Sequence, residues 1–161
     1  MSAEREGNRG VDRPSAETAR RLILEQHLGL RRLLMMGLAQ VTGAEGHQEP
    51  QHEPLRALVE EIQSVFVQHL TDEEGLILPL LEGDLPLGPL RAEALRDEHA
   101  RQRAELETLC AWPDDRSDHE LATRFGQLAA ALLEDIAHEE REVLTSDVIR
   151  DDSIVIDQSG G

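Results

Sequence analysis

The chain has 161 residues, enough for one domain with a buried hydrophobic core. Its 33 acidic and 16 basic residues give a formal net charge of -17 at pH 7, and aromatic residues make up only 2%, so we expect no binding to nucleic acid or to an anionic membrane surface. The single cysteine, Cys110, excludes an internal disulfide and a cysteine-based zinc site.

The composition favours helices, because alanine, leucine, glutamate and arginine are abundant whereas β-branched and aromatic residues are scarce. Residues 1–14 carry charges, two glycines and a proline, and they predict a disordered N-terminal tail. Ser15 can cap a first helix that ends near Gly43. The apolar side of that helix is expected to carry Leu24, His27, Leu28, Leu34, Met35 and Leu38.

Prolines and glycines predict where the second and third helices begin and end. A loop ends at Pro54, which suits the first turn of a helix, and that helix is expected to end near Gly83. Pro89 can open the third helix, which is interrupted at Trp112.

The fourth helix is expected to begin at Ser117, where Glu120 completes a capping box. Four helices of similar length with short loops predict an all-α, up-down-up-down antiparallel four-helix bundle over residues 15–146. Residues 147–161 form a predicted C-terminal tail, in which Ile154–Ile156 are expected to lie against the bundle as an extended segment.

Two polar residues of the second helix lie on its apolar side. His69 and Glu73 share a face because residues four apart on a helix stack above one another. The same face carries Leu55, Leu58, Val59, Ile62, Val65, Phe66 and Leu70. An imidazole and a carboxylate in a hydrophobic core are costly unless they are paired, and a metal ion would make this placement tolerable.

The other three helices also place polar residues on their apolar sides. In an antiparallel bundle these side chains can converge at one level, and three imidazoles with three carboxylates suit one or two transition-metal ions. The residues are His27 on the first helix, His99 and Arg103 on the third, and Asp135 and Glu139 on the fourth.

The sequence also contains a faint internal repeat. The first and third helices share the pattern His-x-x-x-Arg, as His27/Arg31 and His99/Arg103. A helix pair that resembles the next pair is what a two-metal site at a pseudo-twofold axis would produce.

These features resemble the hemerythrin-like (HHE cation-binding) domains over roughly residues 15–146. The strongest segment runs from His69-x-x-x-Glu73-Glu74 to the Leu-Pro pair that ends at Pro79. The resemblance implies a four-helix bundle with a non-haem di-iron centre that reacts with oxygen or related small molecules.

Five residues match the family's ligand pattern. The resemblance implies that His27 and His69 hold one iron while Glu73 and Glu139 bridge to a second. His99 would bind that second iron.

Two positions depart from the family, because Arg103 and Asp135 stand where it has histidines of the second iron. Arginine cannot ligate a metal, so Arg103 is expected to pair with Asp135 or another core carboxylate. One interpretation is therefore a single metal, or a weakly occupied second position. The other, which we favour, keeps two irons, with His99, Asp135 and the two bridges holding the second and Arg103 placed behind the ligands.

The substitutions bear on function, because exchanging imidazole for carboxylate stabilises higher oxidation states. The resemblance therefore implies a redox enzyme that activates oxygen or peroxide rather than a reversible oxygen carrier. Arg103 is expected to hydrogen-bond a bound peroxide or an anionic substrate. The partners would be oxygen, peroxide or another small diatomic ligand, together with an unknown reductant.

Two alternatives remain open at this stage. The protein could bind or sense oxygen, nitric oxide or iron without turnover, or it could be a structural bundle that has lost its metal. No apolar run has the length of a membrane span and residues 1–14 do not resemble a signal peptide, so we expect a cytoplasmic protein.

Overall fold

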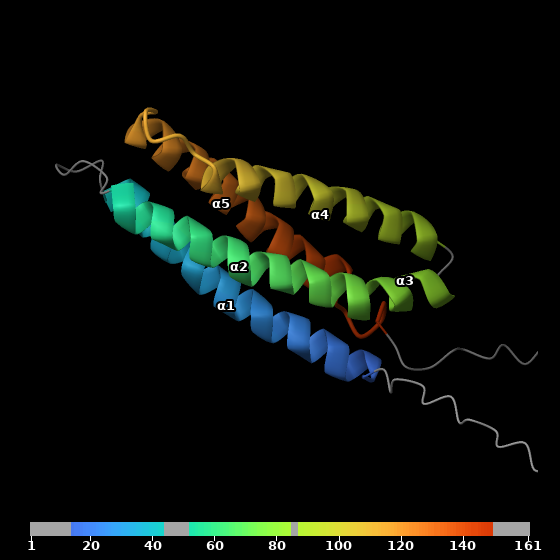
Figure 1. Cartoon of the computed structure of the whole chain (residues 1–161). Helices are drawn as coiled ribbons and strands as arrows, with labels where there is room; N and C mark the ends of the chain where they lie inside the picture. Colours follow the sequence, from blue (N-terminus) through green and yellow to red (C-terminus); the bar gives the residue numbers. More distant parts are fainter. Residues whose placement is uncertain (1–13, 44–51, 85–86, 150–161) are drawn as a thin grey trace, which may run out of the picture.

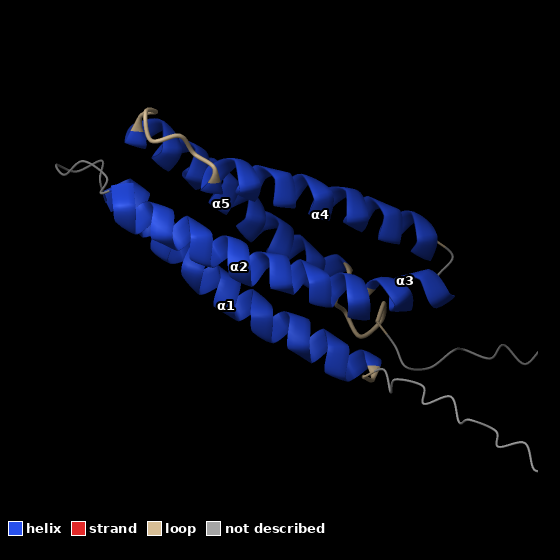
Figure 2. Cartoon of the chain, in the orientation of Figure 1, coloured by secondary structure: helices blue, strands red, loops and turns tan. Residues whose placement is uncertain are grey.

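The computed structural model describes residues 14–43, 52–84 and 87–149. The predictions for the N-terminal tail and for Ile154–Ile156 lie outside these residues. Within them every regular element is helical (Figure 2). No described helix combines the length and the apolar character that crossing a membrane requires.

Four long helices form an up-down-up-down bundle, as the prediction had it (Figure 1). Along the chain, α1 and α2 make one antiparallel pair, a short helix α3 prolongs α2, and α4 and α5 make the second pair. Their bounds are Ala16–Gly43 for α1, His52–Leu76 for α2, Leu78–Asp84 for α3, Gly88–Cys110 for α4 and Asp118–Glu142 for α5.

The second predicted helix is in fact two helices, which meet at Ile77. Pro79 has no backbone N–H to donate to the carbonyl four residues earlier, so the regular hydrogen-bond ladder stops there. The chain continues with bonds from the amides of Leu80 and Leu81 to the carbonyl of Ile77, each 3.0 Å long. Both residues at this interruption of the helix, Ile77 and Leu78, remain buried in the core.

The two predicted helix starts have different outcomes. Ser15 caps α1, since its Oγ accepts a hydrogen bond of 3.2 Å from the amide of Thr18. The capping box at the start of α5 is wrong, because Ser117 makes no side-chain capping bond. The carbonyl of Ser117 instead accepts from the amide of Glu120 at 3.1 Å, so the helix begins at the predicted place without its predicted cap.

The apolar core consists of two clusters, one on each side of a polar layer. The larger includes Leu34, Ile62 and Phe125, and the smaller includes Ile23 and Ile77. Along the chain His27, Glu73, His99 and Glu139 fall between residues of the two clusters, and His69 lies next to Leu70 at the edge of the larger one. The apolar residues thus fix the level at which α1, α2, α4 and α5 bring polar side chains together.

The buried side of α1 differs from the predicted one. Leu28 and Met35 were expected inside, but they are 55% and 56% exposed. Leu30 and Gly37 are buried instead, and the ring of Phe125 occupies the place that a Cβ atom at Gly37 would take.

Candidate metal centre

Five buried donors from four helices meet in the polar layer. They form two groups, His27 with His69 and Glu139, and Glu73 with His99 and Glu139, and within each group the candidate ligand atoms lie within 4.8 Å of one another. Glu139 belongs to both groups, so its carboxylate joins them. Exposure of these residues is 7% for Glu139 and 2% or less for the other four.

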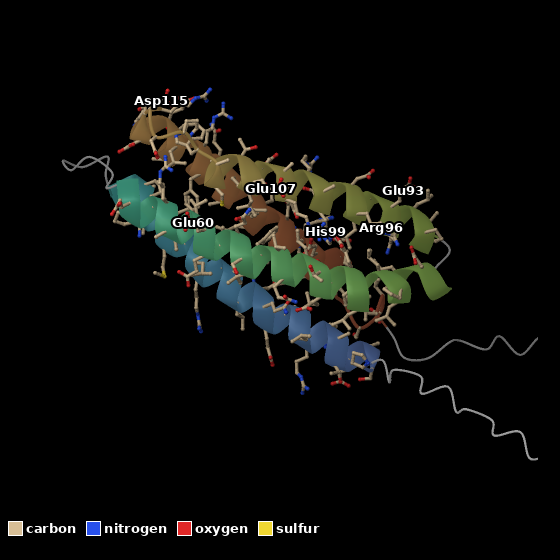
Figure 3. The ribbon with its side chains drawn as sticks, in the orientation of Figure 1. Glu60, Glu93, Arg96, His99, Glu107 and Asp115 are labelled. Atoms are coloured by element: carbon tan, nitrogen blue, oxygen red, sulfur yellow. The ribbon has the colours of Figure 1, made fainter. Side chains whose placement is uncertain are left out.

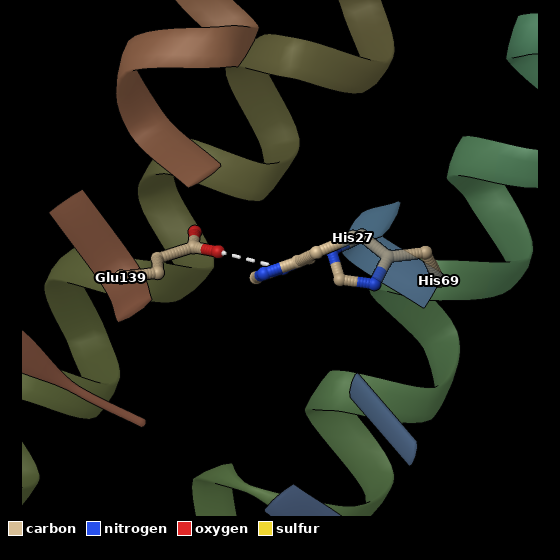
Figure 4. A group of neighbouring side chains, drawn as sticks. All are labelled: His27, His69 and Glu139. Carbon is tan, nitrogen blue, oxygen red and sulfur yellow. Dashed lines mark ion pairs between the residues drawn. The ribbon is translucent and has the colours of Figure 1, made fainter. Parts of the chain in front are cut away.

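Each imidazole directs its Nε2 atom at a carboxylate. His27 Nε2 lies 3.4 Å from Oε2 of Glu139 (Figure 4), and His99 Nε2 lies 3.3 Å from Oε2 of Glu73. His69 Nε2 lies 3.6 Å from the same Glu73 oxygen. In Figure 3, His99 lies on the inner side of α4, whereas Glu93 of the same helix points away from the bundle.

Several atoms at the centre of this layer have no hydrogen-bond partner among the described residues. They are Nε2 of His27, Nε2 of His99 and both carboxylate oxygens of Glu73. A buried polar group without a hydrogen-bond partner destabilises the folded protein by about 1–3 kcal/mol. The cost is larger when the group is a charged carboxylate. A metal cation would bond to these lone pairs, so the residues present fit a metal centre.

The outward nitrogen of His27 is held by what we term the α1 triad, His27, Glu140 and Arg31. His27 Nδ1–H donates to Glu140 at 3.1 Å, and Arg31 donates to both oxygens of that carboxylate at 2.7 and 2.8 Å. Because the proton resides on Nδ1, the lone pair of Nε2 faces the centre.

The same arrangement recurs on the other side of the layer as the α4 triad, His99, Glu74 and Arg103. His99 Nδ1–H donates to Glu74 at 3.0 Å, and Arg103 donates to the same oxygen at 2.8 Å. The His-x-x-x-Arg repeat in the sequence thus corresponds to a repeated set of contacts. In each set the carboxylate comes from the residue that follows a buried glutamate of the layer.

His69 differs from the other two imidazoles, because an amide holds its Nδ1. Nδ1–H donates to Oε1 of Gln26 at 3.1 Å, and Nε2 of Gln26 donates to Asp72 at 2.7 Å. Burial lowers the pKa of His69 to about 4. The imidazole is therefore neutral near pH 7, which is the form that coordinates a metal.

The triads determine the charge of their carboxylates. The hydrogen bonds from Arg31 hold the pKa of Glu140 below its usual value. Burial acts to raise the pKa of Glu74, but hydrogen bonds from Arg103 and His99 outweigh it, and that pKa is also lowered. Both outer carboxylates thus remain anionic acceptors for the imidazole N–H groups.

The inner groups behave differently. Burial is the largest influence on Glu139 and raises the pKa of its carboxyl group. Burial acts to lower the pKa of His99, yet the carboxylates of Glu73 and Glu74 outweigh it and the pKa is raised. The layer therefore attracts positive charge, whether a proton or a metal ion.

The structure brings together five of the predicted site residues and leaves two outside both groups. Arg103 pairs with Glu74, and Asp135 accepts a hydrogen bond of 3.1 Å from Gln102. The prediction for Arg103 named Asp135 or another core carboxylate, but its partner Glu74 is only partly buried, with a side chain that is 32% exposed. The assignment of Asp135 as a metal ligand stays a prediction, and burial raises the pKa of its carboxyl group.

Sequence reasoning missed Gln102. Its side chain is 4% exposed, and its Oε1 has no hydrogen-bond partner in the described part of the chain. Its amide nitrogen bridges Asp135 and Glu98, the latter at 3.3 Å. The available signal was its position three residues after His99, on the same helix face.

Comparison with protein families gives one match, which covers most of the bundle. The family model of the hemerythrin HHE cation-binding domain matches residues 18–145. No curated protein and no solved structure matches the chain.

Proposed function

Because this chain belongs to the hemerythrin HHE cation-binding domain family, we propose that it is a non-haem di-iron protein that activates oxygen or peroxide in a redox reaction. The observation that supports this function best is the layer of five buried donors, in which Nε2 of His27, Nε2 of His99 and both oxygens of Glu73 lack partners. A bundle that needed no metal would gain stability by replacing them with apolar residues.

The donors divide into two groups that share Glu139. His27 and His69 would hold one iron, and His99 would hold the other. Glu73 and Glu139 would bridge the two, and Asp135 is the predicted further ligand of the second. When bound, iron supplies one-electron redox steps to an oxygen or peroxide molecule.

The protein's own contribution is orientation and exclusion of water. The α1 triad and the α4 triad hold two imidazoles by their Nδ1 atoms, so that their Nε2 atoms are aimed at the centre. The Phe66 ring, whose centroid lies 5.7 Å from that of His69, and Leu70 lie in the adjoining apolar cluster. A dry layer of this kind strengthens electrostatic interactions and limits side reactions.

The donor set favours turnover over reversible carriage. The second position has one imidazole, His99, among its buried donors, and the rest are carboxylates. Anionic oxygen donors stabilise a higher oxidation state of iron more than neutral nitrogen donors do. Arg103 forms an ion pair with Glu74, so it would have to break this pair in order to bind peroxide.

The test is anaerobic loading of metal-free protein with Fe²⁺, followed by measurement of oxygen uptake and of peroxide consumption with an oxygen electrode. We expect Glu139→Gln to lower both rates at least about tenfold, because this carboxylate is common to the two donor groups. The exposed Glu134→Gln on the same helix is the matched control and should behave as wild type. Repeated binding and release of oxygen without oxidation would contradict an enzyme and support the binding or sensing alternative.

A further inference from the structure

A cavity of about 400 Å³ lies between α4 and α5, outside the donor layer. Its apolar walls include Leu81 and Leu95, and its polar lining is dominated by the carboxylates of Glu98, Asp135, Glu139 and Glu142. The volume falls within the range of ligand sites, about 300–1,000 Å³, so ions and small molecules can enter it.

Glu139 connects this cavity with the candidate metal centre. It lines the cavity, and it also belongs to both donor groups. The other four donors are more deeply buried, and none of them lines the cavity. Beyond Glu139 lie the unpartnered oxygens of Glu73 and the unpartnered Nε2 of His99, which form one of the two groups with it.

The charge of the lining suits a cation. The lining holds four carboxylates together with His138 and the exposed Arg91, and Glu98 also pairs with Arg101 outside the cavity, so that acidic groups are in excess. A concave surface lined by one sign of charge focuses the electric field and speeds the arrival of the opposite charge. Carboxylate oxygens are also competent transient ligands for divalent metal ions.

We propose that divalent transition-metal ions reach the centre through the α4–α5 cavity, attracted by Glu98, Asp135 and Glu142 and transferred to Glu139. The inference rests on the proposed function, because it requires that the donor layer binds metal. It gives Asp135, which lies outside both donor groups, a role in metal uptake.

The experiment follows Co²⁺ uptake by metal-free protein in a stopped-flow absorbance instrument, with the visible bands of bound cobalt as the signal. In the double variant Glu98→Gln/Glu142→Gln we expect uptake about threefold slower or more at low ionic strength, with the same final cobalt content. The difference from wild type should shrink as salt is added, because salt screens charges at the surface.

The control is Glu93→Gln/Glu134→Gln, which removes the same charge from exposed positions of the same two helices, neither of which lines the cavity. It should take up cobalt at nearly the wild-type rate. A second test is Leu95→Trp, which narrows the cavity without changing its charge and should also slow uptake.

Two results would overturn the proposal in different ways. If both cavity variants take up cobalt as fast as the control variant, the entry route is wrong while the metal centre stands. If wild-type protein binds no cobalt and no iron, the proposed function and the entry route fail together.

Discussion

Glu73 should lower the stability of the metal-free protein, because its carboxylate is fully buried and neither oxygen has a hydrogen-bond partner. Replacing it by methionine, which has a similar length, removes the buried polar group and keeps the volume filled. An unsatisfied buried polar group costs about 1–3 kcal/mol, so Glu73→Met should be more stable than wild type by about that amount in the absence of metal. For a chain of this size the gain corresponds to a rise of about 2–12 °C in Tm.

Metal should reverse the order of the two proteins. Wild type in the presence of metal at 1,000 times its Kd gains about 4.1 kcal/mol, which exceeds the advantage of the variant, and the variant should gain little because it lacks one of the buried donor carboxylates. Thermal unfolding followed by circular dichroism, with and without a chelator at pH 8, measures both effects.

The matched control is the neighbouring Glu74→Gln. Glu74 is partly exposed and accepts hydrogen bonds from Arg103 and His99, so its replacement should destabilise the metal-free protein rather than stabilise it. If Glu73→Met destabilises the metal-free protein as much as Glu74→Gln does, Glu73 is a structural residue. The metal-centre reasoning would then be refuted.

Three further perturbations test other parts of the structure. The pKa of His69 is about 4 in the folded protein and 6.5 ordinarily, so only the unfolded chain binds this proton between those pH values. His69 alone should therefore lower the stability of metal-free protein by about 3 kcal/mol as the pH falls from 6.5 to 4. In denaturant unfolding at several pH values, His69→Gln should lose about that much less than wild type. Gly37→Ala would place a Cβ atom against ring carbons of Phe125 and should lower the free energy of unfolding by about 1–3 kcal/mol, whereas Gly29→Ala, with nothing near its Cβ, should raise it by about 0.5–1 kcal/mol. Arg31→Met breaks the α1 triad and should weaken metal affinity about 10–100-fold in a chelator competition, and an unchanged affinity would show that the triad does not orient its imidazole.

Helical periodicity was sufficient to predict the bundle and most of the donor layer. His27, His69 and Glu139 lie at positions of an apolar stripe, and the stripe has to face the core. Four such stripes in an antiparallel bundle bring their polar members to one level.

The sequence could not predict which residues of α1 and α4 are buried where this depends on packing between helices. On α1 an apolar stripe could be drawn through Leu28 and Met35, but the helix packs with Gly37 against Phe125 and leaves these two residues exposed. On α4, Gln102 and Arg103 lie one residue apart on the helix, and spacing alone could not tell which of them is buried.

The pairing of Arg103 with Glu74 likewise depends on how α2 and α4 are placed relative to each other. In the sequence, Glu74 ends a run of three acidic residues that begins at Asp72, and such runs are usually solvated. In the structure it accepts hydrogen bonds from a core imidazole and from an arginine. These hydrogen bonds depend on a contact between α2 and α4, which the local sequence pattern cannot predict.

Metal content per chain, measured by elemental analysis on untagged protein together with its optical spectrum, tests the central claim most directly. We expect about two irons per chain, with the near-ultraviolet bands of a bridged centre, and the loss of both in Glu73→Ala. Protein that contains no iron after gentle purification, takes none up on reconstitution and is equally stable with and without it would contradict the account. About one iron, rising toward two in Arg103→His, would show instead that the position beside His99 no longer holds metal.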